Sequence, residues 1–156
     1  MSSFRLAGLD PAPFEPLFLL DDMQLAARGI ARRFADADRG FPCRASLEDA
    51  RRGEELLLLN HEHLPAASPY RASGPIFVRR GARRPVLAPG QVPPYVASRL
   101  ISLRAYDQAH FMVDAQVHEG SVVGAWLEAA FARWEVAYVH LHNSRHGCYS
   151  CLAERV

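Results

Sequence analysis

Apolar and polar side chains alternate along several stretches of the chain, and this pattern predicts β-strands. A period of two is typical of a strand that turns one face toward a core. Strands with this pattern are predicted at Phe4 to Leu9, Ile30 to Ala35, Arg99 to Tyr106, His110 to His118, Val136 to Asn143 and Cys148 to Arg155. The last four form two pairs with short connections, which is the pattern of β-hairpins.

One further strand has a different pattern. Leu56 to Leu59 is apolar at every position, which is typical of a strand covered on both faces, and we expect it to be central in its sheet. Ile76 to Val78 is predicted as a strand that begins after Gly74-Pro75.

Helical spacing is confined to a few segments. The longest predicted helix runs from Ser121 to Trp134, because its apolar residues recur at intervals of three and four. Ser121 is expected to cap that helix. Shorter helices are predicted at Phe14 to Leu20, from Asp21 or Asp22 to Arg28, and from Ser46 to a stop at Gly53.

These elements predict an α+β fold, in which a largely antiparallel sheet carries few helices on one side. A chain of 156 residues with 49% hydrophobic and 22% charged residues has the length and composition of one globular domain, so residues 1–156 are expected to form a single domain. A monomer or a homodimer fits that size.

Charge and targeting signals exclude several classes of partner. The formal net charge of +1 provides no general attraction to nucleic acid or to membranes. We therefore expect a cytoplasmic protein, because the N-terminal residues lack an apolar signal core and no apolar run has the length of a membrane span. Three cysteines without a secretory signal predict thiols rather than a disulfide framework.

Several short motifs follow one another along nearly the whole chain. They are Gly40-Phe41-Pro42-Cys43-Arg44, Leu47-Glu48-Asp49-Ala50, Gly53-Glu54, Ser68-Pro69-Tyr70-Arg71, Gly74-Pro75-Ile76-Phe77-Val78-Arg79, Arg104-Ala105-Tyr106-Asp107 and Gly147-Cys148-Tyr149. With these motifs the chain resembles a bacterial family, the domain of unknown function 1203. That family has no established activity, so the resemblance implies a single domain and assigns no catalytic residue.

Several arginines and tyrosines of these motifs are candidates for an anion site. Arg44, Arg71, Arg79 and Arg104 carry guanidinium groups, which bind carboxylates and phosphates through two parallel hydrogen bonds. Tyr70 and Tyr106 lie beside them in the sequence. The alternative is that each arginine forms an internal ion pair that holds a loop in place.

Two His-x-His pairs, His61 with His63 and His140 with His142, each place two imidazoles on one face of a strand. Zinc or iron would need a third protein ligand, for which Cys43, Asp114 and His146 are the candidates. No bound metal is expected, because neither pair has an identifiable third ligand and solvated histidines at strand ends explain both pairs.

Cys43 is the candidate nucleophile. It precedes Arg44 and lies near the predicted helix start at Ser46, and both features favour a thiolate. The alternative is a buried structural thiol that packs beneath the loop.

The residues support three functions. The first is the binding of a small carboxylate or phosphate compound by Arg44, Tyr70, Arg71, Arg104 and Tyr106, with no cofactor. The second is a thiol- or metal-dependent enzyme that acts on a small molecule. The third is a protein-interaction domain without a pocket.

Overall fold

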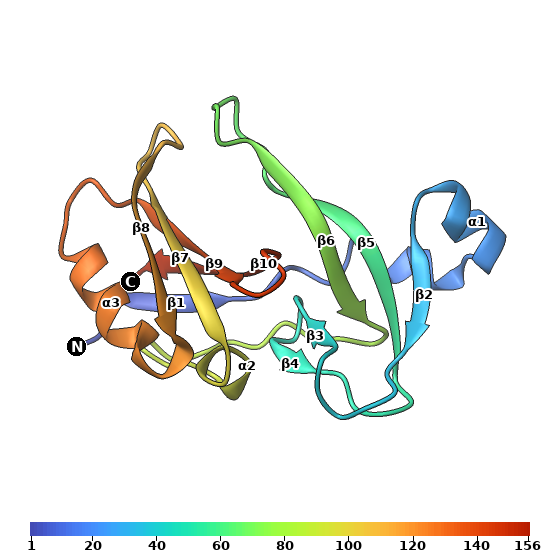
Figure 1. Cartoon of the computed structure of the whole chain (residues 1–156). Coiled ribbons are helices and arrows are strands. Elements are labelled where there is room, and N and C mark those ends of the chain that lie inside the picture. The colour runs from blue at the N-terminus through green and yellow to red at the C-terminus, as the bar shows by residue number, and fades with distance from the viewer. The chain divides into compact units, whose positions relative to one another are not determined.

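The computed structural model describes all of residues 1–156, and its contacts divide the chain into two compact units. The first unit contains Met1–Ala7, Glu62–Ser73 and Val86–Val156, and the second contains Gly8–His61 and Gly74–Pro85. Figure 1 shows the strands and the few short helices of both units. The predicted α+β fold with mostly antiparallel strands is confirmed, but the strands form two sheets instead of one.

The sheet of the first unit has five antiparallel strands in the order β1-β10-β9-β7-β8. Its members are β1 (Phe4–Ala7), β7 (Leu100–Tyr106), β8 (Met112–Glu119), β9 (Tyr138–Asn143) and β10 (Tyr149–Arg155). Four of the five lie within the predicted strands, and β8 ends one residue beyond its predicted end at His118. The two predicted hairpins, β7 with β8 and β9 with β10, are therefore confirmed, and the pairing of β7 with β9 joins them at the centre of the sheet.

The helix α3 (Val123–Phe131) contributes several buried side chains to this unit. The turn η2 (Gly120–Val122) leads into α3, which lies near β1 in Figure 1. Val123, Leu127 and Phe131 are buried, as the helical spacing predicted.

The ends of α3 differ from the prediction. Ser121 is not a cap, because it lies inside η2 and no side chain caps α3. The helix also ends before Trp134, whose side chain is 92% exposed. The Arg155 guanidinium donates to the carbonyl of Phe131, the last residue of α3, and to those of Arg133 and Val136 beyond the helix. It thus satisfies a carbonyl at the helix end, where intrahelical partners are missing.

The second sheet has the order β2-β5-β6-β3-β4. Its strands are β2 (Ala31–Phe34), β5 (Glu55–Leu64), β6 (Ala72–Arg79), β3 (Pro42–Cys43) and β4 (Glu48–Asp49). The pairing of β3 with β6 is parallel, and those of β2 with β5 and of β3 with β4 are antiparallel. The strands β5 and β6 each continue from one unit into the other along the chain.

The apolar run in β5 is covered on both faces, as predicted. Leu57 and Leu59 pack in a cluster with Ile76 and other buried residues, while Leu56 packs in a separate cluster with Ala35. Two short helices belong to the same unit. They are η1 (Glu15–Leu19) and α1 (Asp22–Ala27), and Asp21 caps α1 reciprocally with Gln24.

The predicted helix from Ser46 to Gly53 is wrong. Leu47 is buried with φ 54°, a left-handed conformation that a helix does not accommodate, and Glu48–Asp49 form β4. The backbone N–H of Ala50 donates to the carbonyl of Phe41, so this segment pairs with β3 instead of bonding to itself.

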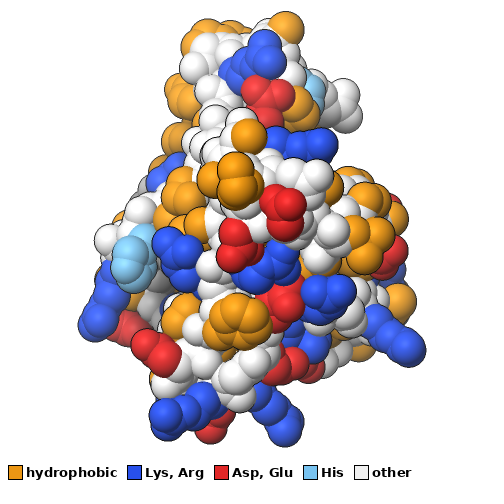
Figure 2. Space-filling view, turned by 90° about the vertical axis from the view of Figure 1, so that its right-hand side faces the viewer, with side chains coloured by type: hydrophobic (Ala, Val, Ile, Leu, Met, Phe, Trp, Pro, Cys, Tyr) orange, Lys and Arg blue, Asp and Glu red, His pale blue; other side chains and the backbone are white.

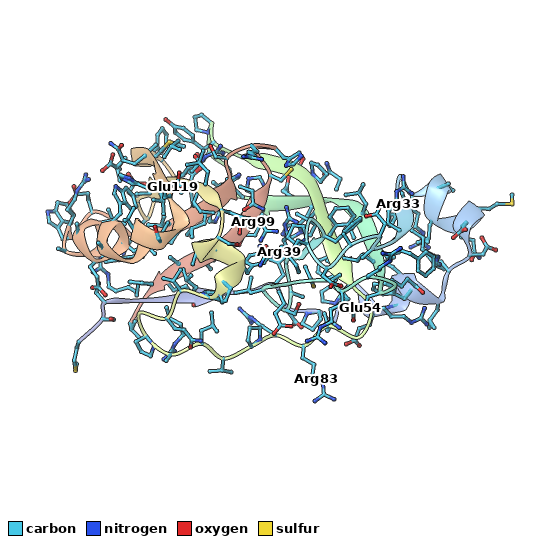
Figure 3. The ribbon with its side chains drawn as sticks, turned by 60° about the horizontal axis from the view of Figure 1, so that its bottom comes forward. Arg33, Arg39, Glu54, Arg83, Arg99 and Glu119 are labelled. Atoms are coloured by element: carbon cyan, nitrogen blue, oxygen red, sulfur yellow. The ribbon has the colours of Figure 1, made fainter.

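Acidic and basic side chains are interspersed on the face drawn in Figure 2, without a large area of one sign. This mixture agrees with the low net charge. Figure 3 shows Arg83, in the connection after β6, projecting away from the ribbon.

No helix of the protein has the length and apolar character needed to cross a membrane. The remaining helix, α2 (Pro94–Ala97), is a single turn.

Candidate functional site

The two faces of the first sheet have different chemistry. Along β9, Val139 and Leu141 are fully buried apolar residues, and the residues that alternate with them are Tyr138, His140 and His142. Successive side chains of a strand point to opposite faces, so these three polar side chains share one face.

The neighbouring strand β7 extends this polar face. Arg104 pairs with His140, and Tyr106 pairs with Tyr138. Side chains directly opposite each other on paired strands lie on the same face. The rings of Tyr106 and Tyr138 are stacked with their centroids 5.3 Å apart, and the Tyr106 ring meets that of His140 at the same distance.

A third histidine reaches this face from the end of β5. The ring centroid of His63 lies 5.0 Å from that of His142 and 5.8 Å from that of His140. One ring nitrogen of each histidine lies within 4.8 Å of those of the other two. Three imidazoles from two different strands therefore form one cluster, which we call the three-histidine cluster.

Tyr149 packs against all three rings of the cluster. It is stacked on His63 with centroids 5.2 Å apart and meets His140 and His142 edge-on at 5.2 and 5.8 Å. The register of β10 shifts between Tyr149 and Cys151, which is a β-bulge. In a regular strand these two residues would point the same way, so the bulge lets Tyr149 face the histidines while Cys151 pairs with Leu141 of the core.

A hydrogen bond determines which ring nitrogen of His142 carries a proton. Its Nδ1 lies 3.0 Å from the carbonyl oxygen of Gly147. A carbonyl oxygen only accepts, so Nδ1 carries a proton, and in the neutral ring Nε2 carries the lone pair. Gly147 has φ 76°, a left-handed conformation that glycine adopts easily, in the turn before β10.

Burial controls the charge of His140, whose side chain is 5% exposed. Burial, together with the nearby His63, His142 and Arg104, lowers the pKa of His140 to about 3. The ring is therefore neutral near pH 7.

A second histidine–tyrosine contact lies on the same side of the unit. The Nδ1 atom of His110 is 2.7 Å from the Tyr138 hydroxyl, and burial, with smaller effects of Tyr106 and Asp107, raises the pKa of Tyr138 to about 12. His110 has φ 66°, and its carbonyl accepts a hydrogen bond of 2.7 Å from the Ser68 hydroxyl. The loop thus holds His110 in a backbone conformation that is uncommon outside glycine.

Part of this polar face borders a pocket of about 790 Å³. Its polar lining consists of His63, His110, Tyr138, His140, Glu154 and Arg155, and its apolar lining includes Leu64 and Leu152. Arg104 is outside this lining and is paired with His140 on the adjacent strand. The volume suits a small molecule, and apolar walls with a few convergent polar groups are typical of ligand sites.

The predicted anion residues of this unit are placed as follows. Arg104 is half-buried and its Nε donates to the Ser102 hydroxyl at 3.3 Å, and it forms no ion pair. Tyr70 meets Tyr106 edge-on at 6.0 Å. The exposed Arg71 forms an ion pair with Glu62 at 2.9 Å, which is the alternative role considered from the sequence.

Arg44, Arg79 and Cys43 belong to the second unit, where Arg79 forms an ion pair with Glu54 at 3.1 Å. The buried Arg44 donates to the Pro42 carbonyl at 2.8 Å. Cys43 is completely buried, and its sulfur accepts backbone N–H groups from Arg79 at 3.3 Å and Ser46 at 3.5 Å. The burial expected for a structural thiol is therefore observed.

The interpretation of both histidine pairs as solvated strand ends is wrong for the second pair. His142 is 1% exposed and His140 is 5% exposed, because β9 is the middle strand of its sheet. His61 lies in the second unit and packs edge-on against Phe14 at 6.2 Å. The third histidine beside the second pair is His63, and none of the three third ligands considered from the sequence is in the cluster.

Two residues of this region were not singled out from the sequence as site residues. Tyr149 occupies its place because of a bulge that no glycine or proline marks, and Tyr138 looks like an ordinary strand residue. The alternation of Tyr138, His140 and His142 was the available signal for Tyr138, since it places all three on one face.

Comparison with known proteins identifies the family but no activity. No curated protein matches the chain, and no solved structure matches it. A family model described as "Protein of unknown function (DUF1203)" matches residues 40–155, which include the whole three-histidine cluster. This match covers well over half of the chain and agrees with the resemblance carried by the sequence motifs, so the chain belongs to the DUF1203 family.

Proposed function

We propose that the protein binds a small molecule with a carboxylate or phosphate group in the pocket beside His140, and that Arg104 binds the anionic group. One observation carries this proposal. Arg104 is a half-buried arginine without an ion-pair partner, and it lies opposite a histidine that lines the pocket.

The electrostatics of the polar face support an anion. A guanidinium that is partly removed from water and not paired with a carboxylate lacks compensation for its desolvation. The nearby His140 is neutral at pH 7, and the one carboxylate of the pocket lining, that of the exposed Glu154, forms no ion pair with Arg104. A bound carboxylate or phosphate would supply the missing charge and accept two hydrogen bonds from one guanidinium.

The aromatic neighbours define the remainder of the proposed site. Tyr106 packs beside Tyr138 and His140, and Tyr70 packs against Tyr106. Arg71 is left outside the site because Glu62 already pairs with it, and Arg44 is left outside because it belongs to the second unit. The pocket favours a small-molecule ligand over the alternative of a protein-interaction domain without a pocket.

A thermal-shift experiment tests this function. A panel of carboxylates and phosphates is added to metal-free protein, and a ligand present at a hundredfold excess over its dissociation constant stabilises the folded state by about 2.7 kcal/mol. Arg104→Ala should abolish the shift in melting temperature. Arg145→Ala, which removes an exposed arginine from the turn before β10, is the matched control and should retain the shift.

The proposal is rejected if no compound of the panel stabilises the wild type more than Arg104→Ala. It is also rejected if Arg145→Ala loses the shift to the same extent, because the effect would then follow overall charge instead of a site.

A further inference from the structure

The three-histidine cluster combines properties that aromatic packing alone does not require. Its members come from strands far apart in the sequence, and one ring nitrogen of each lies within 4.8 Å of those of the other two. The Nδ1 atom of His140 is buried without a hydrogen-bond partner. A buried polar atom that lacks a partner is rare in proteins and requires a specific explanation.

We propose that His63, His140 and His142 together bind one divalent transition-metal ion, and that zinc is a suitable ion. Imidazole nitrogen is a common ligand of zinc, and three protein ligands with an open fourth position are typical of catalytic zinc sites. This proposal goes beyond anion binding and does not depend on it.

The geometry fits an ion after small side-chain rotations. Zinc–nitrogen bonds of about 2.0–2.1 Å in a tetrahedral arrangement hold the nitrogens about 3.3 Å apart. The present separations of up to 4.8 Å are larger than this. His63 is the half-buried member and lies near the end of β5, so its side chain has the most freedom to move toward the other two.

Hydrogen bonding prepares His142 as a ligand. Because its Nδ1–H donates to the Gly147 carbonyl, Nε2 presents its lone pair. Metal-bound histidines usually donate their other ring N–H in this way, which fixes the orientation and the tautomer. The turn that places Gly147 is therefore part of the proposed site.

The surroundings also predict what occupies the open position. Arg104 lies opposite His140 on the adjacent strand, so a dication in the cluster would have a guanidinium nearby. An anionic ligand, either hydroxide or the proposed carboxylate or phosphate, would compensate both positive charges. The metal-dependent enzyme considered from the sequence is thereby favoured over the thiol-dependent one, because Cys43 is fully buried.

Metal binding is measured on untagged protein from which metals have been removed with a chelator. Zinc is titrated in competition with a chromophoric chelator, and bound zinc is counted by elemental analysis after gel filtration. The wild type should bind one equivalent. His63→Ala should weaken zinc binding by about 100-fold or more, since even loss of an outer partner of a ligand costs 10–100-fold.

His61→Ala is the matched control. His61 lies on the same strand two residues before His63 but contacts Phe14 outside the cluster, so its removal should leave the affinity unchanged. Replacement of the buried His140 or His142 by alanine would leave a cavity and lower stability, and for this reason His63→Ala is the main variant.

A second measurement needs no variant. Zinc added to the wild type should shift the ring-proton NMR signals of three histidines and leave those of His61, His118 and His146 in place. The proposal is overturned if the wild type retains only substoichiometric zinc, if His61→Ala weakens binding as much as His63→Ala, or if zinc shifts the signals of those three other histidines.

Discussion

His140 is surrounded by groups that disfavour its charged form. Burial is the largest effect, followed by His63 and His142, and the pKa falls to about 3. An unfolded chain would give this residue an ordinary pKa of about 6.5. Between these two values the unfolded state binds more protons than the folded state, so stability increases with pH in this window and is lost as pH falls through it.

The first prediction concerns this pH dependence. When the pH is lowered from 7 to 5, the free energy of unfolding of the metal-free protein should fall by about 2 kcal/mol, because His140 can be protonated in the unfolded state but not where it is buried. His140→Gln has no titrating group at this position. Its free energy of unfolding should therefore fall by about 2 kcal/mol less than that of the wild type between pH 7 and pH 5. Urea denaturation at both pH values measures the difference.

His118→Gln is the control for this measurement, because it removes a histidine of β8 that is outside the three-histidine cluster. Between pH 7 and pH 5, the free energy of unfolding of His118→Gln should fall by as much as that of the wild type. Equal losses for His140→Gln and the wild type would show that His140 does not control acid sensitivity.

The second prediction concerns the reactivity of Cys43. Its side chain is completely buried, so iodoacetamide at pH 7 should modify native Cys43 more slowly than a model thiol and reach it only after unfolding. Cys148 is partly exposed and is an internal comparison that should react first in the folded protein. Peptide mass spectrometry at successive times follows both residues.

A thiol-dependent mechanism would require the opposite order. Rapid and selective alkylation of Cys43 at pH 6.5 in folded protein would identify it as an activated nucleophile and support the thiol-dependent enzyme.

At the scale of elements, α3 is the only helix longer than two turns, and it contacts β1 and buries large side chains such as Leu127 and Phe131. Leu127 is fully buried within it. The short strands β3 and β4 have only two residues each and depend on backbone hydrogen bonds to neighbouring strands. Side-chain substitutions do not remove such bonds, whereas a substitution in α3 removes a buried side chain and so tests the contribution of that helix directly.

The third prediction is that Leu127→Ala reduces the free energy of unfolding by about 2–5 kcal/mol, because it leaves a cavity in a packed core. Trp134→Ala is the control. Its side chain is 92% exposed beyond the end of the helix, so its removal should change stability by less than about 0.5 kcal/mol. Urea denaturation of both variants gives the comparison, and equal effects would contradict the observed end of α3.

At the scale of the whole molecule, the chain passes repeatedly between two compact units, and both β5 and β6 contribute residues to each. Unfolding of one unit would therefore disrupt strands that continue into the other. The single domain expected from length and composition stays a prediction, which the unfolding of the two units tests.

The fourth prediction is that both units unfold together. Peptides from residues 139–155 and from residues 42–59 should lose their protection against hydrogen exchange at the same urea concentration, because shared strands make unfolding cooperative. Native-state hydrogen exchange followed by mass spectrometry measures both regions in one sample. Separate transitions would instead identify two independent domains.

Local patterns in the sequence were sufficient for most of the elements. Alternation located β7, β8, β9 and β10, and helical spacing located α3 to within a turn at each end, because both patterns reflect the periodicity of a single element. The strands β5 and β6 are longer than their predicted apolar segments, Leu56 to Leu59 and Ile76 to Val78. The segment after Ser46 was predicted as the wrong type of element. Its capping residue and glycine predict a helix, whereas burial of Leu47 and pairing with β3 are tertiary effects that override them.

The sequence by itself determined the family motifs, the fold class and the pairing of His140 with His142 on one strand face. Only the tertiary structure decided that His63 joins them while His61 does not, and that a bulge turns Tyr149 toward all three. The physical reason is that periodicity specifies the face of a strand on which a side chain lies. Which side chains of other strands lie beside it depends on strand order and register. Both are set by packing between segments far apart in the chain.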